Sequence, residues 1–352
     1  MLSTCVANVY LSSRGFLIAK IPVNNSRKGG SMVESRQRIS QQYDGHTNFI
    51  DKTDATRHAS LGQPPSRCDT YVTISPSNLV PPTGAAFQQC LRTIMSPVLV
   101  VGGTRGLGAS LVKQYAADAG NTVYGTTRSE EGPEGFPDAV KWLPGIDLMD
   151  ENVGKTLVSV LGGSKPLSTV IITAGYFATE DFSTEKGPNW AEEQRMYTTS
   201  SIAPVFIVHA LAHAGLLQKD SKVVLVSSES GSITLRHEKE GGGNYAHHAS
   251  KAALNMVGKL LSLDLKDKGV IISIVHPGFM RTEMTKGVGF DKYWDDGGAV
   301  TPDEAAESLI KWTTKLDISK TGEYWAPRGP RDIGTAEPVL GKELSTPLHL
   351  PW

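Results

Sequence analysis

Cysteine is scarce in this sequence. Its 352 residues include three cysteines, Cys5, Cys68 and Cys90, and all three precede the first regular pattern of apolar segments. The patterned part therefore offers no thiol for a disulfide, a thiolate nucleophile or a cysteine-ligated metal. His209 and His213 share one face of a predicted helix without a third ligand, so we expect helix packing there and no metal site.

Long hydrophobic runs and an excess of charge are missing as well. No apolar stretch approaches the roughly 20 residues that a membrane-spanning helix needs. The formal net charge is -1, without the basic block that a nucleic-acid-binding surface requires. We therefore expect no membrane span and no nucleic-acid partner, and we expect a soluble protein of the cytoplasm.

Residues 1–94 show no sustained hydrophobic period and are rich in polar residues and proline. We expect a disordered extension there. Residues 1–33 contain four basic residues and no acidic one, which is the composition of a transit peptide and would favour mitochondria. An alternative is a start site placed too far upstream, because Met95 immediately precedes the first strand.

From residue 97 onward, short apolar segments alternate with helix-length segments, which is typical of a parallel sheet covered by helices on both faces. The predicted strands are Val98–Val101, Thr122–Thr126, Val140–Leu143, Thr169–Thr173, Lys222–Ser227 and Val270–His276. The predicted helices are Leu107–Ala117, Gln194–Leu217, Ala249–Asp267 and one from Thr301 to about Leu316. We predict one Rossmann-type, doubly wound α/β domain over residues 95–330, with a tail over residues 331–352 that packs on its surface.

A glycine-rich turn follows the first predicted strand and precedes a helix. Gly102, Gly106 and Gly108 have the spacing to bring backbone amides close to a pyrophosphate at the helix N-terminus. A plain loop would also tolerate glycines, but the strand-turn-helix context favours a nucleotide. The turn's other candidate cofactor-binding residues are Thr104, Arg105 and Leu107.

The second predicted strand ends at Arg128. An acidic residue there would bind the ribose 2′-hydroxyl of NAD, whereas an arginine can pair with the 2′-phosphate of NADP. Arg105 in the glycine turn adds a second positive charge. Either arginine alone would also fit a solvated surface position, but the two together favour NADP(H) as the cofactor.

Four further motifs follow in the order of the predicted strands. They are Thr173-Ala174-Gly175, Ser227-Ser228, His247-x-x-x-Lys251, and Pro277-Gly278 with Thr282. Together with the glycine turn they make the segment from residue 97 to about residue 316 resemble the short-chain dehydrogenase/reductase superfamily. The residues around Lys251 are similar to those of its single-domain carbonyl-reductase-like branch.

The resemblance implies a role for each of these positions. Ser228 would orient a substrate carbonyl, Lys251 would bind the nicotinamide ribose, and Thr282 would bind the nicotinamide carboxamide. The remaining implied cofactor contacts are Ala174, Gly175 and Pro277, together with Asp147 and Leu148, which follow the third strand where the family contacts adenine.

Two positions depart from the family pattern. His247 stands where the family has its catalytic tyrosine, and Ser200 stands where it has an asparagine that anchors a relay water. The positive charge of Lys251 disfavours a charged imidazole, so we expect a neutral ring that takes a proton more readily than it gives one. Tyr245 does not share a helix face with Lys251, so we expect it to pack beside the cleft. Altered chemistry and an inactivating change both fit this pattern.

The sequence therefore predicts an NADP(H)-dependent carbonyl reductase or alcohol dehydrogenase. Residues 287–298 contain Phe290, Tyr293 and Trp294 at the family's substrate lid, which suits a small hydrophobic or polyketide-like carbonyl or alcohol, as in secondary metabolism. The alternatives are a catalytically impaired NADP-binding protein and a non-redox isomerase or cyclase. The protein would be a monomer, or a homo-oligomer through the helix Ala249–Asp267.

Overall fold

The computed structural model describes residues 8–11, 17–20, 72–73, 96–185 and 187–352. The chain forms two units, Met1–Gln88 and Gln89–Trp352. In the first unit, β1 (Asn8–Leu11), β2 (Leu17–Lys20) and β3 (Val72–Thr73) pair as an antiparallel sheet. The rest of the predicted extension, with all three cysteines, lies outside the described residues.

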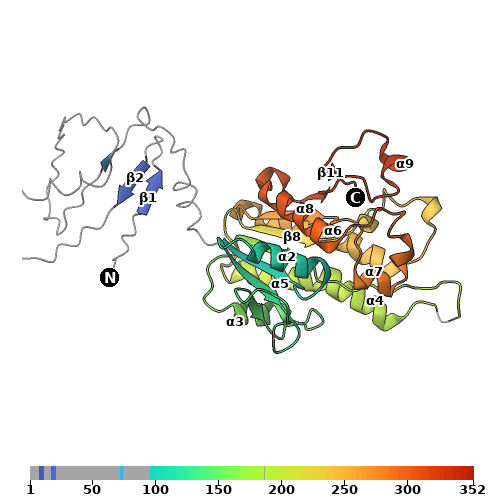
Figure 1. Ribbon diagram of the computed structural model, residues 1–352, viewed down its shortest axis with the longest axis horizontal. Coiled ribbons are helices and arrows are strands. Elements are labelled where there is room, and N and C mark those ends of the chain that lie inside the picture. Colours follow the sequence, from blue (N-terminus) through green and yellow to red (C-terminus); the bar gives the residue numbers. More distant parts are fainter. Residues whose placement is uncertain (1–7, 12–16, 21–71, 74–95, 186) are drawn as a thin grey trace, which may run out of the picture. The chain divides into compact units, whose positions relative to one another are not determined.

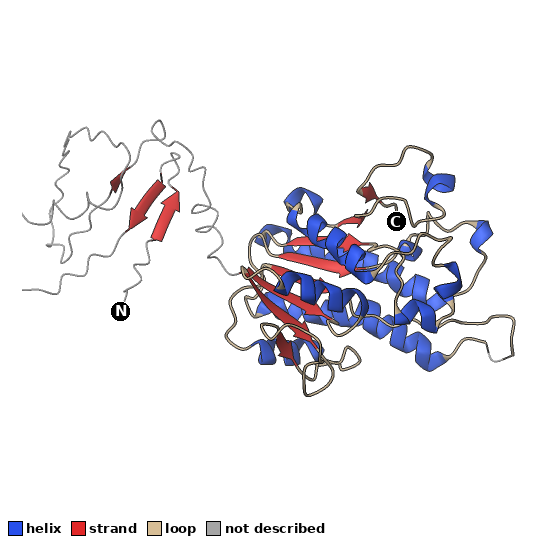
Figure 2. Cartoon of the chain, viewed as in Figure 1, coloured by secondary structure: helices blue, strands red, loops and turns tan. Residues whose placement is uncertain are grey.

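An eight-stranded sheet forms the centre of the second unit (Figures 1 and 2), in the order β11-β10-β9-β8-β7-β4-β5-β6. All neighbouring strands are parallel except β10 and β11, which are antiparallel. The strands are β4 (Ser96–Val101), β5 (Asn121–Thr126), β6 (Lys141–Leu143), β7 (Thr169–Ile172), β8 (Lys222–Val226), β9 (Ile271–Val275), β10 (Glu323–Ala326) and β11 (Leu348–His349). The structure thus confirms the Rossmann-type α/β fold and all six predicted strands.

Helices cover both faces of this sheet (Figure 2). They are α2 (Gly106–Ala116), α3 (Val153–Leu161), α4 (Trp190–Tyr197), α5 (Ala203–His213), α6 (Tyr245–Leu265), α7 (Glu283–Gly287), α8 (Pro302–Thr314) and α9 (Ala336–Leu340). Alternate residues of β4 enter different cores. Leu99 packs in a cluster with Ile207 of α5, whereas Val100 packs in a cluster with Leu111 of α2 and Leu309 of α8. Because both strand faces are buried, the strands are apolar nearly throughout.

The helix predicted over Gln194–Leu217 is not continuous. It consists of α4, a π-helical turn at Thr198–Ile202, and α5. Within or beside that turn, Thr199 Oγ1 donates to Arg195 O at 2.8 Å and Ser201 Oγ donates to Tyr197 O at 2.9 Å. These hydroxyls compete for backbone carbonyls that would otherwise accept helical hydrogen bonds from backbone N–H groups. This competition weakens the regular α-helical hydrogen bonding just before α5.

No strand is predicted for the segment from Lys320 to Trp352. It contributes β10 and β11 to the sheet, and Tyr324 and Leu350 belong to a third buried cluster. Both strands are too short to show a hydrophobic period, which is why sequence reasoning missed them. The predicted tail over residues 331–352 is therefore partly built into the sheet.

Helix α6 carries an apolar outer face. Met256, Leu260 and Leu263 are each more than half exposed there. Across the described ranges, no helix is both long and apolar enough to cross a membrane. Pairing of two copies through this face stays a prediction.

Candidate functional site

Two glycines have no room for a side chain, one in the turn between β4 and α2 and one in the first turn of α2. A Cβ on Gly102, whose φ is +88°, would lie 2.8 Å from the backbone of Ala174, and a Cβ on Gly108 would lie 2.1 Å from Gly102 O. Gly102 N also donates to Thr126 Oγ1 at 2.9 Å. The backbone at the N-terminus of α2 is therefore closely packed and has no side chain at these two positions, which suits the approach of a phosphate.

One cavity of about 1390 Å³ lies over this turn and extends across the carboxyl ends of the strands. Every predicted site residue except Ser200 lines it. These residues are Gly102, Thr104, Arg105, Gly106, Leu107, Gly108, Arg128, Asp147, Leu148, Ala174, Gly175, Ser228, His247, Lys251, Pro277 and Thr282. Ligands of open α/β sheets bind at this end of the strands.

Thr173 connects the end of β7 to the glycine turn. Its Oγ1 donates to Val101 O at 3.0 Å and lies 3.2 Å from Gly102 O. In the sequence, Thr173 belongs to the Thr173-Ala174-Gly175 motif, which assigns no role to its hydroxyl. The structure shows that its hydroxyl bonds to the backbone just before the turn.

Lys251 is buried beneath the cavity. Its Nζ donates to Val226 O at 3.0 Å, and burial lowers the pKa of this lysine to about 8. A Cβ built on Gly175 would lie 3.8 Å from Lys251 Nζ and 3.9 Å from Ser200 Oγ. Ser200 Oγ is buried without a hydrogen-bond partner among the described residues. Gly175 thus leaves a small polar space between the ammonium group and the hydroxyl.

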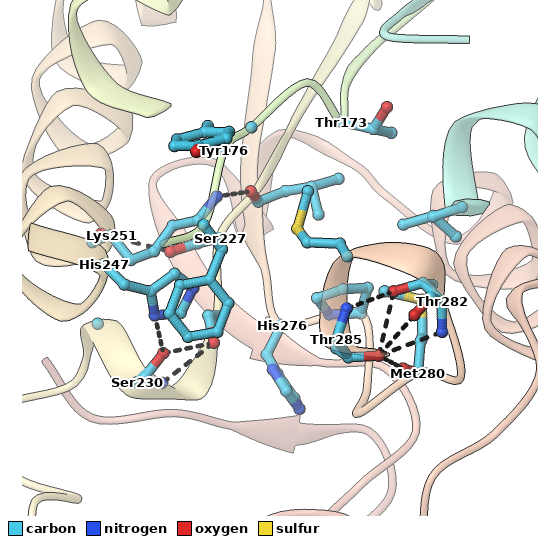
Figure 3. A pocket seen from close by; sticks show the side chains of 18 of the residues that line it. Thr173, Tyr176, Ser227, Ser230, His247, Lys251, His276, Met280, Thr282 and Thr285 are labelled. Carbon is cyan, nitrogen blue, oxygen red and sulfur yellow. Dashed lines mark hydrogen bonds between the residues drawn. The ribbon is translucent and has the colours of Figure 1, made fainter. Parts of the chain in front are cut away.

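Ser228 and His247 are joined through a third residue, Ser230, which lies beside His247 in Figure 3. Ser228 Oγ is 2.6 Å from Ser230 Oγ, and Ser230 Oγ is 3.4 Å from His247 Nδ1. Sequence reasoning missed Ser230. Its place depends on the 3-10 turn at Glu229–Gly231, which folds its hydroxyl back onto Ser228.

The His247 ring is neutral near pH 7. Burial, followed by the nearby groups Lys251, His248 and Arg236, lowers the pKa of His247 to about 3. Phe177 stacks on the ring, with centroids 4.1 Å apart. The ring is therefore fixed against an aromatic wall and carries no charge.

Aromatic side chains form one wall of the cavity. Phe290 meets Phe177 edge-on at a centroid distance of 5.6 Å, and Tyr293 meets Phe290 at 6.0 Å. Trp294, which we expected to cover the substrate, instead donates its indole N–H to Thr285 Oγ1 at 3.2 Å and does not line the cavity. Two of the three predicted lid aromatics therefore face the cavity.

Thr282 begins α7. Its Oγ1 accepts from Thr285 N at 3.2 Å in a capping box. Its methyl group lies 3.6 Å from the position that a Cβ on Gly106 would take, so Thr282 faces the glycine turn across the cavity. Its predicted contact with a nicotinamide stays a prediction.

A buried polar group links the C-terminal segment to the site. His276 Nδ1 accepts from Glu229 N at 3.0 Å, and His276 Nε2 lies 3.6 Å from Asp332 Oδ2. The same carboxylate oxygen accepts from Phe279 N, next to the Pro277-Gly278 turn. Sequence reasoning missed Asp332 because no local sequence pattern links it to His276 or Phe279, which lie more than 50 residues earlier in the chain.

The metal-binding pattern that we considered stays incomplete. The rings of His209 and His213 lie 4.3 Å apart, and both residues are exposed on α5. Across the described part of the chain, no group of three or more His, Cys, Asp or Glu residues is placed to bind a metal ion. The polar groups that do converge are those of the strand-end cavity.

The parallel sheet, the glycine turn after β4 and the Ser-His-Lys cluster at the strand ends define a Rossmann-type α/β protein with a large cavity at the carboxyl ends of its strands. The family model described as short chain dehydrogenase matches residues 96–292. The chain belongs to this family of oxidoreductases.

Relatives and solved structures agree with that assignment. The 1-hydroxy-2-glutathionyl-2-methyl-3-butene dehydrogenase of a Rhodococcus species is 28% identical over 232 residues, which cover 65% of this chain and 96% of that protein. An uncharacterized oxidoreductase of Saccharomyces cerevisiae is 27% identical over 258 residues, which cover 66% of this chain and 96% of that protein.

Two carbonyl reductase structures share the fold. A Caenorhabditis elegans protein provisionally described as the carbonyl reductase Sniffer is 28% identical, with a TM-score of 0.54, and the match covers 68% of this chain and 98% of that one. The NADPH-bound carbonyl reductase from chicken fatty liver is 21% identical, with a TM-score of 0.57, and the match covers 73% and 94% of the two chains.

Proposed function

We propose that this protein is an NADP(H)-dependent oxidoreductase that interconverts a carbonyl and an alcohol on a small hydrophobic or polyketide-like substrate, as in secondary metabolism. One observation carries the proposal. A single cavity joins the glycine turn to Ser228, His247 and Lys251. Ligand pockets commonly measure about 300–1,000 Å³, so this larger cavity has room for a dinucleotide and a substrate together.

The residues present fit a dinucleotide phosphate. The N-terminus of α2 offers backbone amides, and Arg105 and Arg128 are exposed at the cavity without an acidic partner among the described residues. Arginine binds phosphate bidentately, so these two side chains suit a 2′-phosphate. When bound, the dinucleotide supplies or accepts a hydride. Lys251 would bind the ribose on the nicotinamide side, and Leu148 would contact the adenine.

The neutral His247 ring favours alcohol oxidation over carbonyl reduction. A group whose pKa is about 3 is almost never protonated at neutral pH, so His247 has no proton to give to a developing alkoxide. It can accept a proton from an alcohol only if it passes that proton on to water. Ser228 would bind the substrate oxygen, and the aromatic wall would contact the apolar part of the substrate.

The same feature favours a second candidate function. A site with a neutral base and no ready acid suits proton abstraction without redox, as in an isomerase or cyclase, or simple cofactor binding. The two candidates differ in whether the nicotinamide changes its redox state.

The test is turnover of NADPH with a panel of ketones and of NADP⁺ with the matching alcohols, for the natural chain and for His247→Tyr. We expect the natural chain to reduce NADP⁺ with an alcohol, and we expect His247→Tyr to gain relatively more carbonyl reduction. NADPH fluorescence titration reports binding separately. If NADPH binds to both forms and neither form turns it over, the oxidoreductase proposal is wrong and the non-redox candidate is favoured.

A further inference from the structure

Three side chains that line the cavity, Ser228, Ser230 and His247, are joined in a line by hydrogen bonds. Figure 3 labels Ser230 and His247. Ser228 Oγ lies 2.6 Å from Ser230 Oγ, which lies 3.4 Å from His247 Nδ1. The second distance is long for a hydrogen bond, as catalytic hydrogen bonds often are before substrate binds. Ser230 is 6% exposed, so little bulk water competes for its hydroxyl.

One arrangement of the hydroxyl hydrogens gives every donor in this line an acceptor. Ser228 Oγ accepts from Ser230 N at 3.3 Å, and its own hydroxyl hydrogen can be donated to Ser230 Oγ. The Ser230 hydroxyl can then donate to His247 Nδ1. The neutral ring must in that case carry its hydrogen on Nε2. Each donor in the line therefore has one acceptor, and Ser228 retains a lone pair for a substrate hydroxyl.

The position of the His247 ring makes its contact with Ser228 depend on this line of hydrogen bonds. An imidazole is shorter than a phenol, so His247 does not extend as far from α6 as a tyrosine would. Phe177 stacks on the ring, with centroids 4.1 Å apart, and restricts the movement of the imidazole. The hydroxyl of Ser230 fills the gap between the ring and Ser228.

We propose that Ser230 is a positioning residue that relays the proton between Ser228 and His247, an inference that rests on the proposed oxidoreductase function. As the alcohol carbon gives its hydride to the bound oxidised dinucleotide, the alcohol O–H bond breaks and its proton goes to Ser228 Oγ. The hydrogen of Ser228 passes to Ser230 Oγ, and that of Ser230 passes to His247 Nδ1. The ring then releases its Nε2 proton to water, because Lys251 and burial disfavour the charged form.

The experiment compares Ser230→Ala in two backgrounds, the natural chain and His247→Tyr. With His247 present, we expect kcat for alcohol oxidation to fall about 100-fold, with little change in KM, because general acid-base proton transfer by positioned side chains contributes about 10²–10⁴-fold. With His247→Tyr, the phenol reaches the substrate directly, and we expect Ser230→Ala to change kcat by less than about threefold. A merely structural serine would lower kcat by the same factor in both backgrounds.

A second readout is independent of turnover. In ¹⁵N NMR spectra of the ring, Ser230→Ala should shift the His247 Nδ1 resonance, because it removes the donor to that atom. The matched control is Thr234→Ala. It removes a hydroxyl that donates to Trp352 O at 2.7 Å, from the same loop but away from the cavity. We expect it to leave both kcat and the Nδ1 resonance unchanged.

The outcomes separate this relay from the proposed function. If the natural chain oxidises alcohols and Ser230→Ala lowers kcat equally in both backgrounds, or lowers it in neither, the relay is wrong while the oxidoreductase stands. An unshifted Nδ1 resonance in Ser230→Ala also overturns the relay. If the natural chain binds NADPH but turns over no alcohol or ketone, the proposed function itself fails.

Discussion

The imidazole of His247 stacks on the phenyl ring of Phe177, with centroids 4.1 Å apart and planes inclined by 30°. The two residues come from different parts of the chain, the loop after β7 and the first turn of α6. Phe177 thus shields from water the residue that replaces the family's tyrosine. The contact explains why burial is the largest cause of the low His247 pKa.

Phe177→Ala should raise the pKa of His247, because water would then solvate the charged imidazole. The shift can be followed by NMR titration of the ring. Phe182→Ala is the matched control, since Phe182 is exposed and contacts Tyr245 rather than His247. A His247 pKa that stays near 3 in Phe177→Ala would mean that Lys251 and its charged neighbours, rather than burial, set its value.

Arg128→Asp should weaken NADPH binding at least tenfold and NADH binding far less. The change removes a partner of the 2′-phosphate and introduces an acid suited to the 2′-hydroxyl of NADH. Dissociation constants from fluorescence titration test this. Lys165→Asp makes the same change of charge on an exposed residue outside the cavity and should affect neither. Equal losses for the two cofactors in Arg128→Asp would show that Arg128 does not recognise the 2′-phosphate.

Sequence reasoning succeeds here where one local rule decides the structure. Strands buried on both faces read as apolar runs, and the glycine turn needs only β4 and α2 beside it. It fails where contacts between distant residues decide. The π-helical turn depends on side-chain hydroxyls such as that of Thr199. The position of Ser230 depends on the 3-10 turn that follows Ser228. The role of Asp332 depends on its contact with His276. The spacing of apolar residues along the sequence does not report these side-chain contacts.

Thr173→Val should lower the free energy of unfolding by about 1 kcal/mol, because its hydroxyl no longer bonds to the backbone at the glycine turn. NADPH affinity should fall as well, since the turn becomes less well positioned. Chemical denaturation and fluorescence titration measure the two effects. Thr314→Val removes a hydroxyl hydrogen bond to Lys311 O at 2.8 Å, at the exposed end of α8, and should leave NADPH affinity unchanged. Unchanged affinity in Thr173→Val would show that Thr173 supports the fold alone.

The depressed pKa of His247 should make folding stability depend on pH. The folded-state pKa is about 3 and the ordinary value is 6.5, so between these values the unfolded chain binds a proton that the folded chain does not. This contribution to stability is complete above about pH 6.5 and is lost as the pH falls toward 3.

Comparison with His247→Phe isolates the contribution of this histidine, because other titrating groups are common to both proteins. From pH 7 to pH 5 the natural chain should lose about 1–2 kcal/mol more stability than the variant, measured by urea denaturation at each pH. Phenylalanine matches the size of the ring and preserves the stack on Phe177. Parallel pH profiles for the two proteins would mean that His247 titrates normally in the folded state, and a charged imidazole would then be available as an acid for carbonyl reduction.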